Sequence, residues 1–179
     1  ITVYNGFTTA DIMKNGENLK GHASAAQSGI VIPRPKHPGH YYIVTAPCRF
    51  DSPVKELFYS EVDYNDINEK GRGIVIASTK NTQLTLTGVP ANSAYENITA
   101  VSHINGIDFW LVHRSRGNFY VWLITEDGFT SLTPYKTFAI GVDPGVPADS
   151  SGRGQIKISS DGTQVAVSGH NTVTYAKFN

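Results

Sequence analysis

The feature that most constrains the fold of this 179-residue chain is a pattern of three short apolar strands that occurs three times. Each copy has a first strand, a turn, a second strand, a polar gap and a third strand. The copies occupy residues 29–32, 41–45 and 57–62, then 98–101, 109–113 and 119–124, and finally 155–158, 164–168 and 172–176. Repeats at a spacing of tens of residues are typical of propellers and solenoids, whose units stack on one another.

The residues between the strands favour tight antiparallel hairpins. The first two strands are joined by Asn105-Gly106 in the second copy and by Asp161-Gly162 in the third. These dipeptides tolerate the positive φ angles that short hairpin turns require. The corresponding joint in the first copy is the Pro- and Gly-containing segment 35–39. We therefore expect each copy to be an antiparallel meander.

The strands mix alternation with continuous apolar runs, as in residues 164–168. A continuous run indicates a strand that is buried on both faces. Only 17% of the residues are charged and 17 are glycine, which suits an all-β protein with many turns. The sequence predicts a β-propeller-like repeat of about three antiparallel blades. The arc is partial or open, because closed propellers need about four to eight blades. A β-sandwich is the main alternative.

Further segments are candidates for the fourth, outer strand of each blade. Residues 73–77 or 83–86 are expected to serve the first copy and residues 136–140 the second, whereas the third copy has no such segment. Residues 1–4 have strand character and are a candidate outer strand of a preceding blade, and residues 9–16 are helical or irregular. We interpret residues 1–179 as one propeller-like domain, a fragment of a larger protein, whose third copy contacts further blades, a neighbouring domain or a second copy.

Charge and hydropathy exclude two classes of partner. The chain has 15 basic and 15 acidic residues, so its net charge gives no general attraction to nucleic acid. No run approaches the ~18 apolar residues that a membrane span requires, so we expect no membrane insertion. Cys48 is the single cysteine, and we expect it to be a small buried residue.

Recognised catalytic and metal-binding patterns are missing from the sequence. The six histidines do not show metal-ligand spacing, and no nucleophile elbow, phosphate loop or calcium loop occurs. We therefore predict no catalytic residues, no metal and no cofactor. The candidate binding residues are His103, which follows a first strand and is expected to face a central channel, together with Trp110, His113 and Tyr42. Aromatic rings at an open end of the arc are suited to stacking on sugars or on a partner.

An ordered series of segments resembles a known family. The segments are YNG (4–6), NG (15–16), SAAQSGIVIPRP (24–35), YYIVT (41–45), LFYSEVD (57–63), ENITAVSHINGIDFWLV (96–112) and IKISSDGTQVAV (156–167). The series resembles the N-terminal propeller-like region of large Bacteroidetes surface proteins that are linked to gliding motility and type-nine secretion. The resemblance implies export and an extracellular or outer-surface location, and it carries no catalytic motif.

These observations support a noncatalytic, adhesin-like module that binds a protein or glycan at the cell surface. The alternative is a hydrolase or lactonase-type enzyme on a complete propeller. An enzyme of that kind needs His, Asp or Glu side chains that converge at the strand ends, and the three copies share no such residues. We therefore expect the isolated domain to be catalytically silent and metal-independent.

Overall fold

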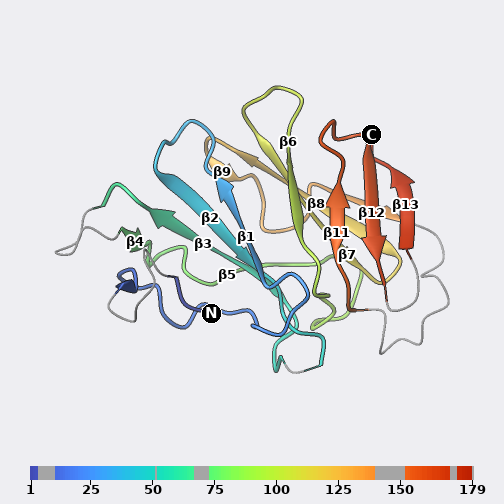
Figure 1. Ribbon diagram of the computed structural model, residues 1–179, viewed down its shortest axis with the longest axis horizontal. Helices are drawn as coiled ribbons and strands as arrows, with labels where there is room; N and C mark the ends of the chain where they lie inside the picture. Colours follow the sequence, from blue (N-terminus) through green and yellow to red (C-terminus); the bar gives the residue numbers. More distant parts are fainter. Residues whose placement is uncertain (4–10, 51, 67–72, 140–151, 170–172, 179) are drawn as a thin grey trace.

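The computed structural model describes residues 1–3, 11–50, 52–66, 73–139, 152–169 and 173–178. In these residues the fold is all-β, without an α-helix, and every strand pairing within its three sheets is antiparallel (Figure 1). None of the sheets is closed. The three expected meanders are confirmed, one in each sheet.

The first sheet contains the first copy of the repeat. Its strands are β1 (Gly29–Pro33), β2 (His40–Thr45), β3 (Leu57–Asp63), β4 (Ile74–Val75) and β5 (Thr82–Leu84). Both short strands β4 and β5 pair with β3, at opposite ends of that strand. Residues 73–77 and 83–86, which the sequence offered as alternative outer strands, therefore both contribute an outer strand, each beside one end of β3.

The second sheet contains the second copy. Its strands are β6 (Thr99–Ser102), β7 (Phe109–Ser115), β8 (Asn118–Thr125), β9 (Gly128–Phe129) and β10 (Lys136–Ala139). Strands β6, β7 and β8 form one consecutive meander, and β10 pairs with β8 as its outer strand. The outer strand expected at residues 136–140 is confirmed through Ala139, and residue 140 lies outside the described residues.

The third sheet contains only three described strands, β11 (Ile156–Ile158), β12 (Gln164–Ser168) and β13 (Val173–Lys177). The turn at 159–163 has Gly162 at φ 72°, as the Asp-Gly dipeptide predicts. Asp161 stabilises this turn by accepting hydrogen bonds from the backbone N–H and the hydroxyl of Thr163. The loop at 142–150 and the second hairpin connection at 170–172 lie outside the described residues.

Two apolar clusters join the sheets face to face. The larger one packs β1, β2 and β3 against β6, β7 and β8, with Val44, Leu57, Leu111 and Trp122 at its centre. A second cluster packs the opposite face of the second sheet, including Val112 and Val121, against the third sheet. The second sheet is thus covered on both faces. The continuous run at 164–168 predicted the same for the third sheet, but that expectation is wrong: only Val165 and Val167 of this strand are buried, because among the described residues no further sheet packs on its other face.

The N-terminal segment covers the other face of the first sheet. Val3 and Met13 pack against Val62 and Val75, and the backbone N–H of Val3 donates to the Gly16 carbonyl. Residues 1–3 form no strand, and they contact this sheet rather than extend away from it as part of a preceding blade; Tyr4 lies outside the described residues. Residues 11–16, the described part of the segment expected to be helical or irregular, contain no α-helix, and Lys14 forms a parallel bridge with Ile74.

The first strands of the three sheets lie side by side. Strand β6 contacts both β1 and β11, and the three strands are adjacent in Figure 1. The side chain of Gln27 links the N-terminal ends of β6 and β11, because its Oε1 atom accepts the backbone N–H groups of Ile98 and Ile156. Each first strand is also the terminal strand in the order of its sheet, so the three sheets bring three strand edges to one face of the molecule.

Candidate functional site

An open groove of about 330 Å³ lies between the three first strands. Its lining residues are Val31, Ile32 and Pro33 from β1, Ala100, Val101 and Ser102 from β6, Phe109 from β7, and Ile158, Ser159 and Ser160 at the end of β11. None of these side chains ionises at neutral pH. The groove is therefore uncharged, and its exposed lining is about as polar as it is apolar, with apolar side chains beside serine hydroxyls.

Strand alternation explains why apolar side chains line an exposed groove. Successive side chains of a strand point to opposite faces, so Ile32 enters the core whereas Val31, its neighbour, is 64% exposed. The same alternation places Ala100 toward the first sheet and Val101 toward the third. Each first strand thus contributes apolar surface to both the core and the groove.

His103 and Trp110, two of the four expected binding residues, lie together. His103 directly follows the groove residue Ser102, and its ring centroid is 5.1 Å from that of Trp110. Tyr135 adds a third ring, 5.5 Å from Trp110, and is largely exposed. Sequence reasoning missed Tyr135, although an aromatic residue directly before the expected outer strand at 136–140 was a usable signal.

His113 does not join this cluster. It lies three residues after Trp110 on β7, and such residues point to opposite faces of a strand. The His113 side chain has no exposed surface; its Nδ1 atom is 2.6 Å from the Asn97 carbonyl oxygen, and its Nε2 atom accepts the Tyr95 N–H at 3.4 Å. Burial lowers the pKa of His113 to about 4. In this conformation a ligand at the groove does not reach it.

Tyr42 is also a core residue. Its ring packs edge-on against Tyr59 of the neighbouring strand β3 and against Phe129 of the second sheet. Burial raises the pKa of its hydroxyl to about 12, and the carboxylate of Glu61 adds to the effect. The adjacent aromatic residues 41 and 42 looked equivalent in the sequence, but the register with β3 directs Tyr42 inward.

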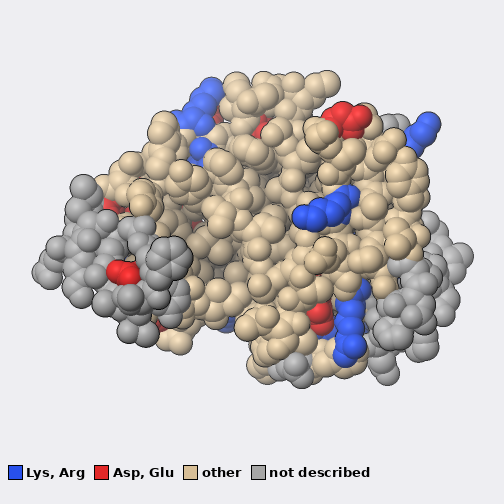
Figure 2. Space-filling view, viewed as in Figure 1, with Lys and Arg blue, Asp and Glu red and all other residues tan. Residues whose placement is uncertain are grey.

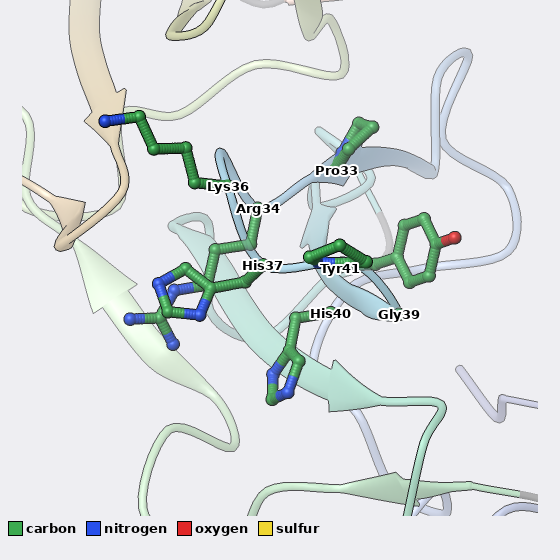
Figure 3. A pocket seen from close by; sticks show the side chains of 8 residues that line it. Pro33, Arg34, Lys36, His37, Gly39, His40 and Tyr41 are labelled. Carbon is green, nitrogen blue, oxygen red and sulfur yellow. The ribbon is translucent and has the colours of Figure 1, made fainter.

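A second, smaller cavity of about 220 Å³ lies at the β1–β2 turn and is lined by basic side chains (Figure 3). Arg34 and His40 both contact Oε1 of the buried Glu61, at 2.8 and 3.0 Å. Lys36 points away from the histidines in Figure 3 and pairs with Glu126 at 2.8 Å. Arg34 also donates to the Glu126 carbonyl at 3.2 Å. The contacts of Lys36 and Arg34 with Glu126 link this turn of the first sheet to the second sheet.

The described residues contain no group of three or more His, Cys, Asp or Glu side chains placed to hold a metal ion. No helix among them is of the length and apolar character that crossing a membrane demands. Cys48 is buried, as expected, and its Sγ atom lies 3.5 Å from Oε1 of Glu96.

Comparison with known proteins gives no relative. No family model, curated protein or solved structure matches this chain.

Proposed function

We propose that this protein is a noncatalytic binding and scaffold module that contacts its partner through the groove between β1, β6 and β11. The observation that carries the proposal is the convergence of all three repeats on one open groove whose lining side chains are apolar or hydroxylic. Ligand sites in repeat folds commonly form where equivalent elements of several units meet.

The architectural part of the proposal is that the three sheets are blades of an open propeller-like arc. Each sheet is a meander, its first strand lies next to the other first strands, and consecutive sheets pack face to face. In a propeller the first strands surround the central channel. The groove then corresponds to the wall of a channel left open on one side. Residues 1–179 form one such domain.

The composition of the groove favours binding over hydrolysis. Catalysis needs an acid, base or nucleophile in the pocket, and none of the groove-lining side chains can serve as an acid or base at neutral pH. The cluster of ionisable side chains around Glu61 is paired internally. A partner that fits an uncharged, partly hydroxylic groove is a protein surface or a neutral glycan. Location outside the cell is supported by the sequence resemblance.

The test compares Val31→Asp with Val173→Asp. Both valines are exposed strand residues, but only Val31 lines the groove. Wild-type protein and both variants are applied to an array of neutral and acidic glycans and to a displayed library of peptides. We expect Val31→Asp to weaken the selected interactions at least about tenfold, since an unpaired carboxylate in an apolar contact costs more than 1.4 kcal/mol, whereas Val173→Asp leaves them unchanged.

Two outcomes would contradict the proposal. One is binding that survives Val31→Asp unchanged, which places the contact elsewhere. The other is turnover of ester or lactone substrates that is lost in His103→Ala, which would favour the enzyme.

A further inference from the structure

The turn between β6 and β7 is held rigid by its own hydrogen bonds. The His103 N–H donates to the Asp108 carbonyl at 2.8 Å, and the Gly106 N–H donates to the His103 carbonyl at 2.9 Å. The Asn105 side chain accepts the N–H groups of Ile107 and Asp108, both at 3.0 Å, and donates to the Asp108 carboxylate at 2.7 Å. The shape of the turn is therefore fixed before any partner arrives.

This rigid turn presents apolar side chains to water. Ile104 is 99% exposed and Ile107 is also exposed. An exposed apolar side chain is common by itself, but here two isoleucines project from a preorganised turn at the tip of a hairpin. Such a turn has the properties of an anchor, because seating it in a pocket costs little conformational entropy.

The groove lies directly beside this anchor. Ser102 and Phe109, the residues that flank the turn, both line the groove. A projection and an adjacent hollow on one face form a self-complementary surface, because a two-fold axis brings the projection of each copy to the hollow of the other. The projecting tips are isoleucines, and the groove lining carries no ionisable side chain. Figure 2 shows that the face containing β1, β6 and β11 is mostly uncharged, with a Lys or Arg side chain over β11, the strand that carries the exposed Lys157.

We infer that a second copy of this chain occupies the groove, with Ile104 of each copy seated between β1 and β11 of the other. This inference rests on the proposed function, in which the groove is the contact surface, and it identifies the partner as a second copy of the chain. The contact is small, with isoleucine side chains against an uncharged groove, so the dimer is weak and concentration-dependent. A glycan or peptide ligand of the groove would compete with it.

Sedimentation velocity tests the inference over protein concentrations from about 5 to about 500 µM, which spans the range expected for a small interface. We expect the wild-type sedimentation coefficient to rise with concentration. Ile104→Ser should raise the dimer dissociation constant at least about tenfold, the effect of losing an apolar contact of about 1.4 kcal/mol. Leu132→Ser, which removes an exposed apolar residue outside the turn and the groove, should leave it unchanged.

Cross-linking tests the pairing directly. When I104C and V31C proteins are mixed in equal amounts and oxidised, the mixed disulfide dimer should clearly exceed twice the amount of each same-variant dimer, which is the ratio that random pairing gives, because the inferred contact brings residue 104 of one copy to residue 31 of the other. Cys48 stays in both variants because it is buried, and oxidised wild-type protein is the control.

A protein that stays monomeric at all concentrations, or a dimer that is insensitive to Ile104→Ser, would overturn the inference. A monomer whose glycan or peptide binding still depends on Val31 would overturn only the self-association. A monomer without any Val31-dependent binding would overturn the proposed function as well.

Discussion

The second and third sheets are built from the same three-strand repeat, but their surroundings differ. The second sheet is buried on both faces, with Leu111 and Trp122 toward the first sheet and Val112 and Val121 toward the third. The third sheet buries only the face that carries Val165 and Val167. On its other face Val173 is 74% exposed and Tyr175 is 62% exposed.

The difference shows that the repeated sequence pattern determines where strands form, whereas the packing of neighbouring sheets determines which faces of those strands are buried. The outward face of the third sheet also carries Lys157, Gln164 and Lys177, where the second sheet has mainly apolar residues. Polar outer faces are a property of terminal units in repeat proteins. Contact of this face with further blades, another domain or another copy stays a prediction.

The largest expected effect on stability is the loss of a buried aromatic ring from the second sheet, compared with the loss of an exposed ring from the third. Trp122→Ala should lower the free energy of unfolding by about 3–5 kcal/mol, because the ring is fully buried and its loss leaves a cavity. Tyr175→Ala should change it by less than about 0.5 kcal/mol, as expected for an exposed residue. Urea denaturation followed by circular dichroism measures both values.

Similar decreases in the free energy of unfolding of the two variants would contradict the difference in burial between the second and third sheets. A large effect of Tyr175→Ala that appears only at high protein concentration would mean that another copy covers the third sheet.

The next effect concerns pH and His113. The pKa of His113 is about 4 in the folded protein because of burial, below the ordinary value of 6.5. The unfolded chain therefore takes up a proton first as the pH falls, so the stabilisation is present above pH 6.5 and is lost between pH 6.5 and pH 4. The unfolding free energy should fall by about 3 kcal/mol over that window. Denaturation curves at several pH values give the slope.

Two variants isolate this histidine. His113→Gln removes the titrating group and should flatten the slope. His103→Gln, on the rim of the groove, should keep the wild-type slope. A wild-type slope in His113→Gln would show that another group causes the pH dependence.

The smallest effect concerns Gln27, which links the second and third sheets. Gln27→Ala removes the acceptor of the Ile98 and Ile156 N–H groups. We expect a loss of about 1–2 kcal/mol, because water partly replaces the amide at this half-buried position. Hydrogen exchange should become faster in β11 than in β7. Gln155→Ala, an exposed neighbour, is the control, and equal exchange rates in β11 of both variants would show that the link contributes nothing.

The sequence predicted local structure well for reasons that particular residues make clear. Asn105-Gly106 and Asp161-Gly162 determine hairpin turns through their backbone dihedral angles, which do not depend on distant residues. The outer strands expected after the first and second copies were also found, with both candidates for the first copy pairing with β3, whereas the strand expected at residues 1–4 is absent at residues 1–3. The candidate binding residues were harder, because Trp110 and His113 belong to one apolar strand and no local signal says which face is covered.

By itself, therefore, the sequence determined the strands and their meander order, whereas the packing of the sheets decided that the second sheet, and not the strand at 164–168, is buried on both faces. Turn chemistry and side-chain alternation are local, and they act within a few residues. Tertiary packing alone decided that Tyr42 and His113 lie in the core, that Tyr135 joins His103 and Trp110, and that β1, β6 and β11 share one groove. These properties depend on which sheet packs against which face, and that contact joins residues far apart in the chain.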